Sequence, residues 1–389
     1  MNKKTKRQTI KLIYMSLITI FILCVAVFIY SYVSFNYYSP DDGEMKADTS
    51  ALKYFKNSYT ECRTEFLSSA NDIKNRFKDV EIFDIQVESE IDTNLTIDFC
   101  YIPAQKEKSK LLIISSGVHG IEGFVGSAVQ RMFMAQLLKG EYINNIGILL
   151  IHGMNPYGFK YLRRVTENNV DLNRNCDIDK NLFSKKNSGY AEFHEMINPK
   201  EKVNIASLGN RLFYIAAIKK IVSVSMKASR QAILQGQYEF EKGIFFGGND
   251  FEPQIYAIKS TLREKIKSIL ESLFSGYAID WGNTKDFYTV TGDFSQFIGK
   301  LSPDALFLFI VFEYGTMNSQ KTMGAIKSLH NMVVENQGFY YGYEDTQDEK
   351  RVKENFIEMC YPSSSAWRSE VMKRTRELMD VFIQRYNDL

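Results

Sequence analysis

Short apolar runs along the chain alternate with amphipathic stretches. The apolar or alternating runs have the length and composition of β-strands, and they occupy residues 80–87, 95–102, 111–115, 146–152, 277–281 and 306–312. Apolar residues recur with helical spacing in residues 122–138, 205–235, 253–274, 321–337 and 364–387. Short, continuous apolar strands that alternate with helices predict an α/β fold in which a mixed, largely parallel sheet is flanked by helices.

The first apolar stretch differs from the others because it is long and uncharged. No charged residue occurs in residues 12–33, and about 20 apolar residues suffice to cross a bilayer. Basic residues precede this stretch and Asp41, Asp42 and Glu44 follow it, which predicts one transmembrane helix with a cytoplasmic N-terminus. The alternative is a cleaved signal peptide, whose apolar region is usually shorter and ends at a small-x-small cleavage site. We therefore expect an uncleaved anchor in the cytoplasmic membrane.

The anchor divides the chain into four parts. We expect a basic cytoplasmic tail at 1–11, the transmembrane anchor at 12–33, a polar linker at 34–50 and one α/β domain at 51–389 outside the cytoplasm. No repeat and no second linker interrupts the last part, whose length is above the usual domain size but within the range of α/β proteins.

The composition is that of a globular protein, with 45% apolar and 24% charged residues. Five basic residues lie in the first eleven positions, and removing them from the formal net charge of +2 leaves −3 on the rest of the chain. A nucleic-acid-binding domain needs a basic stripe on its folded surface. The charge balance therefore argues against nucleic acid as a partner.

An imidazole and a carboxylate follow the predicted strand 111–115. That strand runs into Gly117-Val-His119-Gly-Ile-Glu122, so both groups emerge at the end of a strand, where active sites of α/β folds lie. Both are ordinary zinc ligands, and a catalytic zinc ion normally takes three protein ligands and a water. The alternative is a histidine at a helix start, followed by a glutamate that the helix dipole favours.

Two further polar features follow later strands. A loop rich in arginine and asparagine, residues 163–175, follows the strand 146–152 and suits an anionic ligand, with a solvated loop as the alternative. Glu313 follows a wholly apolar run, where burial would raise its pKa and suit it to general-base catalysis. The alternative for Glu313 is a structural pair with an arginine.

These motifs occur in the order typical of one enzyme superfamily. In chain order they are His119-x-x-Glu122, Asn155-Pro-Tyr-Gly-Phe159, Arg163-Arg164, Asn169-Val-Asp-Leu-Asn-Arg-Asn175 and Phe312-Glu-Tyr-Gly-Thr316. Together they resemble the zinc carboxypeptidase-like (M14-type) superfamily and, within it, the bacterial family DUF2817, whose function is unknown. The resemblance covers roughly residues 55 to 316 and implies a zinc carboxypeptidase-like fold.

The resemblance implies a metal centre and a base. His119 and Glu122 match two zinc ligands of the superfamily, and Glu313 matches its general base, which takes a proton from water and later delivers one to the leaving amine. Zinc lowers the pKa of a bound water and polarises the substrate carbonyl, so these roles agree with the chemistry of the residues.

The resemblance also implies a substrate site. Asn173 and Arg174 match the pair that binds the terminal carboxylate of a substrate. Arg164, or else Arg163, matches the arginine that stabilises the oxyanion, since a fixed cation stabilises negative charge that develops in a transition state.

The third zinc ligand of the superfamily is missing at its expected place. Relatives carry Asp-x-His-Thr-Gly where this chain has Asp280-Trp-Gly-Asn-Thr284, so the histidine position falls on Gly282. Asp280 lies two residues earlier on a predicted strand, shares the face of Gly282, and is therefore a candidate ligand. Asn283 and Asp286 are further candidates if the loop bends.

Two functions from different classes follow. The first is a membrane-anchored, zinc-dependent hydrolase of carboxypeptidase or amidohydrolase type, which acts on peptide or cell-wall-derived substrates outside the cytoplasm. The second is a catalytically degenerate relative that binds carboxylate-bearing ligands without hydrolysis. We expect the first, because the chain retains Glu313 together with His119 and Glu122. The expected partners are a small carboxylate-bearing or peptide substrate and the membrane.

Overall fold

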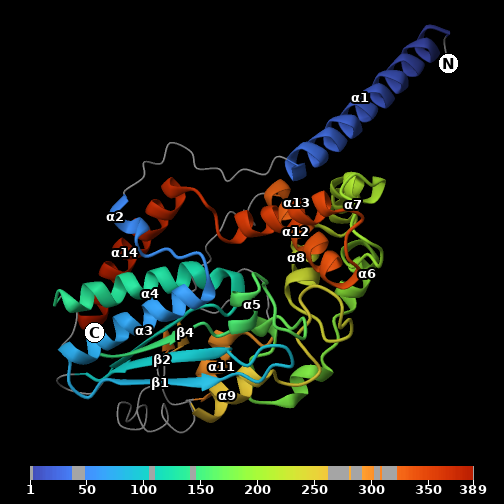
Figure 1. The fold of residues 1–389 in the computed structure, drawn as a ribbon. Coiled ribbons are helices and arrows are strands. Elements are labelled where there is room, and N and C mark those ends of the chain that lie inside the picture. Colours follow the sequence, from blue (N-terminus) through green and yellow to red (C-terminus); the bar gives the residue numbers. More distant parts are fainter. Residues whose placement is uncertain are drawn as a thin grey trace. The chain divides into compact units, whose positions relative to one another are not determined.

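The structure is a computed structural model (Figure 1). It describes residues 3–36, 49–104, 110–140, 146–261, 280–281, 291–301, 307–308 and 322–388. The chain divides into two compact units, and each unit combines three separate stretches of the sequence. The smaller unit takes residues 1–39, 193–229 and 317–356, and the larger unit takes residues 40–192, 230–316 and 357–389. The domain boundaries expected from the sequence stay a prediction.

A four-stranded sheet forms the centre of the larger unit. Its strands are β1 (Glu81–Gln86), β2 (Thr96–Ile102), β3 (Lys110–Ser115) and β4 (Ile146–His152), in the spatial order β1-β2-β4-β3. Strand β2 pairs antiparallel with both β1 and β4, whereas β3 runs parallel to β4. A second, parallel pair joins β5 (Asp280–Trp281) to β6 (Phe307–Leu308). The predicted mixed α/β fold is confirmed, and the described pairings divide equally between parallel and antiparallel.

Side chains that alternate along the strands contribute to two apolar layers, one on each face of the sheet. In β4, Ile148 and Leu150 point to one face of the sheet, while Leu149 and Ile151 point to the other. The first face is covered by α3 (Tyr59–Arg76), α4 (Gly123–Leu138) and α14 (Ser365–Asp388). The second face packs against η2 (Leu172–Arg174), η3 (Lys180–Ser184), α9 (Pro253–Thr261) and α11 (Phe294–Leu301). Figure 1 shows α3 and α4 on one side of the strands, with α9 and α11 on the other.

Short elements connect the strands to these layers. The larger unit also contains α2 (Thr49–Leu52), the 3-10 turn η1 (Gly120–Glu122) and α5 (Pro156–Lys160). Three helices have residues in both units, and they are α6 (Ser188–Ile197), α8 (Met226–Leu234) and α13 (Thr346–Cys360).

The smaller unit is helical in its described residues. Its main helices are α1 (Lys3–Asn36), α7 (Leu208–Val224) and α12 (Thr322–Tyr341). A small apolar cluster of Phe35, Val203, Val334 and Val352 lies at the end of α1. Within α1, residues Arg7–Val33 are long and apolar enough to cross a membrane.

One expected helix, residues 205–235, is two helices in the structure. Helix α7 ends at Val224 and α8 begins at Met226, because Ser225 adopts a φ of 84°, outside the helical region. The Ser225 hydroxyl accepts a hydrogen bond from the N–H of Ala228 at 3.3 Å, which caps the start of α8. Periodicity alone gave no sign of this break, because apolar residues continue on both sides of Ser225.

Candidate active site

A close approach of two backbone segments positions His119. The chain leaves β3 at Ser115 and forms η1, where a Cβ on Gly120 would lie only 2.1 Å from the carbonyl carbon of Gly158 in α5. Residue 120 therefore has to be glycine for the two segments to touch. The N–H of Gly120 donates to the carbonyl oxygen of Arg164 at 3.1 Å. This bond fixes Arg164 beside His119, although Arg164 and Gly120 are 44 positions apart in the sequence.

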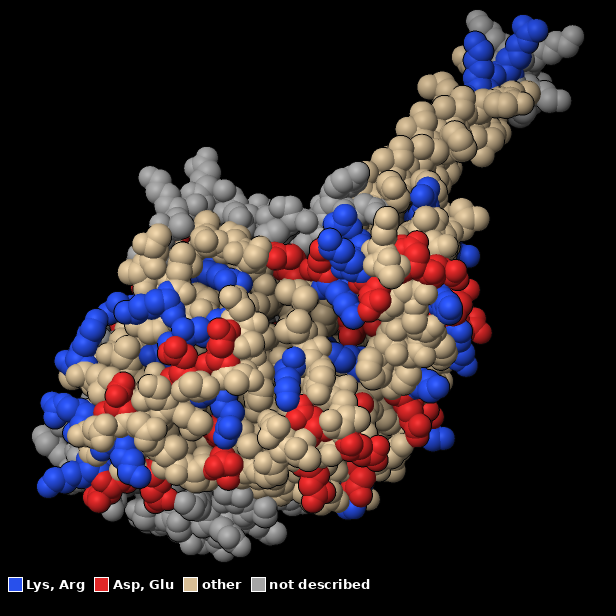
Figure 2. All heavy atoms as spheres, in the orientation of Figure 1, with Lys and Arg blue, Asp and Glu red and all other residues tan. Residues whose placement is uncertain are grey.

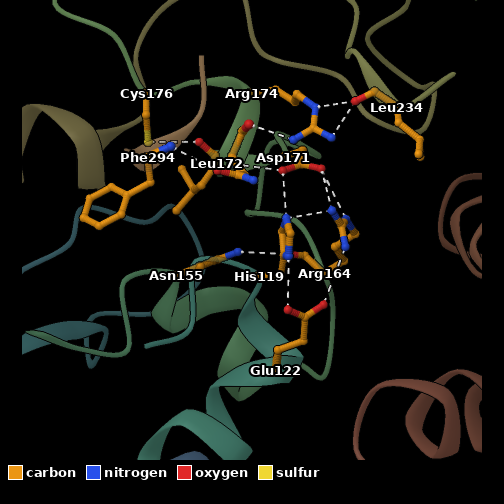
Figure 3. Close-up of polar contacts among 11 residues, drawn as sticks. His119, Glu122, Asn155, Arg164, Asp171, Leu172, Arg174, Cys176, Leu234 and Phe294 are labelled. Atoms are coloured by element: carbon orange, nitrogen blue, oxygen red, sulfur yellow. Dashed lines mark hydrogen bonds and ion pairs between the residues drawn. The ribbon is translucent and has the colours of Figure 1, made fainter. Parts of the chain in front are cut away.

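The His119 ring lies between two carboxylates (Figure 3). Its Nδ1 is 3.2 Å from Oε2 of Glu122, and its Nε2 is 3.2 Å from Oδ1 of Asp171. The Asp171 side chain is fully buried, and that of His119 is 12% exposed. A carboxylate on one ring nitrogen is the usual means by which a protein orients a metal-binding histidine through the other nitrogen.

Arg164 completes the cluster. Its Nη2 lies 2.7 Å from His119 Nε2 and its Nη1 lies 3.6 Å from Oε1 of Glu122, while its Nε donates to Oδ2 of Asp171 at 3.2 Å. A guanidinium group can only donate, so the short contact with Nε2 requires a lone pair on that nitrogen. The single ring proton of a neutral His119 is then on Nδ1 and faces Glu122.

Mutual attraction, rather than burial, decides the charges in this cluster. Burial and Arg164 lower the pKa of His119, but Glu122 and Asp171 outweigh them and raise it above its ordinary value. Burial raises the pKa of Glu122, but His119 and Arg164 leave it lowered. The pKa of Asp171 lies well below its usual range, because Arg164 and His119 overcome the cost of burial. Both carboxylates are therefore ionised at neutral pH and can bind a cation.

Asn173 and Arg174 lie two and three residues after Asp171. Arg174 is only 2% exposed, and its guanidinium donates from Nε and Nη2 to the carbonyl oxygen of Leu234 at 3.1 and 2.6 Å and from Nη1 to that of Asn173 at 2.8 Å. The Oδ1 of Asn173 accepts a hydrogen bond from the N–H of Phe294 at 3.0 Å. Protein contacts thus engage three of the five N–H groups that an arginine carries.

The structure brings together three of the residues expected at the site, which are His119, Glu122 and Arg164. Arg163, the alternative to Arg164, is 5% exposed, and no contact with His119 is described for it. Gly282, Asn283, Asp286 and Glu313 lie outside the described residues, and of Asp280 only the backbone, in β5, is described.

The described donors fit two positions of a zinc site. One imidazole nitrogen and one carboxylate face each other at His119 and Glu122, and both are common zinc ligands. Among the described residues, no three His, Cys, Asp or Glu side chains are arranged to hold a metal ion. A third protein ligand, such as Asp280, therefore stays a prediction.

Sequence reasoning assigned no role to Asp171, although the residue lies in a quoted motif. In the structure Asp171 contacts His119 and Arg164 and accepts a hydrogen bond from the N–H of Asn173 at 3.0 Å. The available signal was an acidic residue in a predicted anion-binding loop, where an unpartnered carboxylate would be unfavourable.

Fold and site together define a mixed α/β protein with a His-x-x-Glu pair at the end of a parallel strand. The sequence matches the family DUF2817, described as a protein of unknown function, over residues 55–281. This match spans more than half of the chain, and the chain belongs to the DUF2817 family.

Similar solved structures include bovine thrombin-activatable fibrinolysis inhibitor in complex with tick carboxypeptidase inhibitor (13% identity, 74% of this chain, 97% of that chain, TM-score 0.38). Others are thrombin-activatable fibrinolysis inhibitor (14%, 80%, 78%, 0.35) and carboxypeptidase A from Helicoverpa armigera (12%, 73%, 73%, 0.36). No curated protein matches the sequence.

Proposed function

We propose that this protein is a membrane-anchored, zinc-dependent hydrolase of carboxypeptidase or amidohydrolase type. Its substrates would be peptides or cell-wall-derived fragments outside the cytoplasm. The observation that carries the proposal is the His119–Glu122 pair, in which Nδ1 faces a carboxylate while Asp171 contacts Nε2. The sequence resemblance to zinc carboxypeptidases supports the same function.

Each residue has a distinct role in this proposal. Zinc held by His119, Glu122 and a third ligand would lower the pKa of water and polarise a carbonyl group. Arg164 lies beside the ligand pair and stabilises negative charge on the carbonyl oxygen. Glu313 accepts the proton of the attacking water and returns a proton to the leaving amine.

The substrate's carboxylate is assigned to the segment after Asp171. Arg174 would use the N–H groups that its bonds to Leu234 and Asn173 leave, and the amide of Asn173 would assist. A guanidinium group matches a carboxylate in geometry as well as in charge. Free carboxyl-terminal peptides should therefore be preferred over amidated ones.

Metal binding requires a change of tautomer at His119. If His119 held zinc through the nitrogen that faces Glu122, the ring proton would lie on Nε2, where Asp171 can accept it. Arg164 Nη2, now 2.7 Å from Nε2, then has to move away from that nitrogen. Arg164 can keep its ion pairs with Asp171 and Glu122 after this movement.

The contact between Arg164 and His119 favours a second function, in which the protein binds carboxylate-bearing ligands without hydrolysis. In the described residues the cation next to His119 and Glu122 is Arg164, and no three-donor cluster is present. A relative that lost its third ligand could retain this arrangement and keep Arg174 for binding.

Activity of the full chain in detergent separates the two functions. We expect release of the last residue from peptides with a free carboxyl terminus, loss of that release with a metal chelator, and recovery with zinc. Glu313→Gln should abolish turnover but retain peptide binding, because only the proton transfer is removed. Peptide binding without turnover in the zinc-loaded wild type, and unaffected by His119→Ala, would instead support the second function.

A further inference from the structure

Helix α7 packs against one end of the apolar helix α1. The guanidinium carbon of Arg211 lies 5.6 Å from the ring centre of Phe28 and 4.5 Å from that of Tyr32. The rings of Tyr30 and Tyr214 meet edge to face with their centres 5.6 Å apart. All the α1 residues in these contacts lie in its last third, and Figure 1 shows α7 beside that end of α1.

The contacts with α7 fall at a defined depth of a membrane. Lys11 is the last charged residue before the apolar stretch, and Figure 2 shows basic side chains at the start of α1 and none along its middle. About 20 helical residues cross the hydrocarbon core, so a span that begins after Lys11 ends near Ser31. Tyr30 and Tyr32 suit the boundary between lipid and water at this end. Helix α7 is therefore attached to α1 at that boundary.

One side of α7 carries three exposed apolar residues together with the exposed Lys219. Leu208, Leu212 and Val222 are 70%, 40% and 81% exposed, and their spacing places them on the same side of the helix. Phe213 and Ala217, on the opposite side, are buried. A surface helix of a soluble protein normally buries its apolar side chains and exposes polar ones to water.

Charge around α7 matches the surface of an anionic membrane. Residues 202–229 contain five basic residues and no acidic residue, although the chain after its first eleven residues is net negative. The basic residues are Lys202, Arg211, Lys219, Lys220 and Lys227. Basic residues near a bilayer surface are attracted to anionic headgroups.

Helix α13 gives an internal contrast. It also contacts the end of α1, because Asn355 donates a hydrogen bond to the carbonyl oxygen of Phe35, four residues beyond Ser31. The exposed side chains of α13 are polar or charged, and those of Lys350 and Lys353 are 77% and 61% exposed. The helix that contacts residues 28–32 thus exposes large apolar side chains, whereas the helix that contacts residue 35 exposes polar and charged ones.

We propose that α7 lies in the interfacial region on the outer side of the cytoplasmic membrane, with Leu208, Leu212 and Val222 in contact with lipid acyl chains. Its basic residues then lie at the level of the headgroups, where anionic lipid strengthens the contact. This inference rests on the proposed anchor. It adds a second membrane contact, so that two helices, α1 and α7, hold the smaller unit at the bilayer instead of α1 alone.

Spin labels on the full chain test this placement. The background is Cys24→Ser, since the other four cysteines are buried. Single cysteines carry a nitroxide at Leu212 or Val222 on α7, at Lys353 on α13 as the exposed control, and at Ile20 in α1 as the anchor control. The protein is placed, one chain to a disc, in nanodiscs of phosphatidylcholine and phosphatidylglycerol. Collision rates with oxygen, which concentrates in lipid, and with a water-soluble nickel chelate are then compared.

We expect the oxygen-to-nickel collision ratio at Leu212 and Val222 to be severalfold higher than at Lys353 and to approach that at Ile20. Ratios at both α7 positions equal to that at Lys353, with a high ratio at Ile20, would overturn the inference and leave the anchor intact. A low ratio at Ile20 would overturn the anchor itself. Protection of α7 only in discs that hold two chains would assign this face to a second copy and also overturn the inference.

Discussion

At the scale of single residues, the Asp171 carboxylate meets three groups of the candidate site. Its oxygens lie 3.2 Å from His119 Nε2, 3.2 Å from Arg164 Nε and 3.0 Å from the N–H of Asn173. The first two partners carry the proposed metal and oxyanion roles, and the third begins the proposed carboxylate site. Asp171 therefore contacts the residues proposed for metal binding, for oxyanion stabilisation and for carboxylate binding, although it has none of these roles itself.

Replacing Asp171 by Asn should weaken zinc binding by about 10–100-fold, the usual cost of losing a partner that orients a metal ligand. An amide fills nearly the same volume, but it no longer stabilises a proton on His119 Nε2. Competition with a chromophoric chelator gives the dissociation constant. Asp177→Asn is the matched control, because Asp177 pairs with Lys300. Equal zinc affinity in Asp171→Asn and the wild type would contradict the role of Asp171.

The sequence predicted which residues lie at the candidate site better than it predicted the contacts between them. His119, Glu122 and Arg164 were expected at the site because their residue types and order match a known motif set. The contact of Arg164 with His119 could not be predicted, because it depends on how η1 and α5 pack. The same holds for Arg174, whose bonds to Leu234 join residues 60 positions apart.

At the scale of elements, the approach of η1 to α5 holds the site together. Gly120 and Gly158 come so close that no side chain fits at residue 120, and the Gly120 N–H bonds the carbonyl oxygen of Arg164. A hydrophobic pattern contains no information about such an approach. The glycine in His119-Gly-Ile-Glu122 is a spacing residue in the motif and a steric requirement in the fold.

Replacing Gly120 by Ala should lower the free energy of unfolding of the larger unit by about 1–3 kcal/mol or more, because the backbone has to move to admit a methyl group. Gly140→Ala is the control, since a Cβ at Gly140 meets no atom within 4 Å and only its positive φ is disfavoured. Urea unfolding, followed by the fluorescence of Trp281 and Trp367, measures both variants. A loss no greater than that of Gly140→Ala would show that η1 and α5 can separate at little cost.

Helices α7 and α12 of the smaller unit enclose a histidine. The ring of His330 stacks on Phe213 with centres 4.4 Å apart, and its Nε2 lies 3.0 Å from Oδ1 of Asn210. Burial lowers the pKa of His330 to about 3. The folded state therefore keeps this ring neutral in conditions where the unfolded chain takes up a proton.

This difference predicts that acid weakens the smaller unit. A lowered pKa in the folded state means that stability is complete above about pH 6.5 and falls by about 1.4 kcal/mol per pH unit below it, until the folded pKa is reached. Hydrogen exchange of α12, corrected for its intrinsic pH dependence, should show this loss between about pH 7.5 and about pH 5. His330→Gln, which can still donate to Asn210, should reduce it. An unchanged slope in that variant would assign the loss to other groups.

At the scale of the whole molecule, the sequence predicted the strands more accurately than the helices. Strands β1 to β4 lie within a residue of the expected runs, because β3 and β4 are short and almost wholly apolar and β1 alternates polar with apolar residues. The polar helices α3 and α13 were not expected, and 205–235 was expected as one helix. Polar helices draw their stability from tertiary contacts, such as the Phe66 side chain of α3 in the core of the larger unit, which a single sequence does not reveal.

The division into two units is a second feature that composition did not indicate. Each unit takes three separate stretches of chain, and no proline-rich or glycine-rich linker marks the crossings. Boundaries of this kind depend on contacts between distant segments rather than on local composition. The proposed anchor and the proposed metal pair lie in different units, so each can be tested without disturbing the other.

The zinc content of the purified full chain is the decisive measurement for the proposed metal centre. We expect near-stoichiometric zinc that is lost in His119→Ala and in Glu122→Ala, and retained in Asp177→Asn. This result would require a third ligand, and Asp280→Ala would then test the first candidate. Metal-free wild-type protein after incubation with zinc would contradict the account and leave a carboxylate-binding protein without the hydrolytic chemistry.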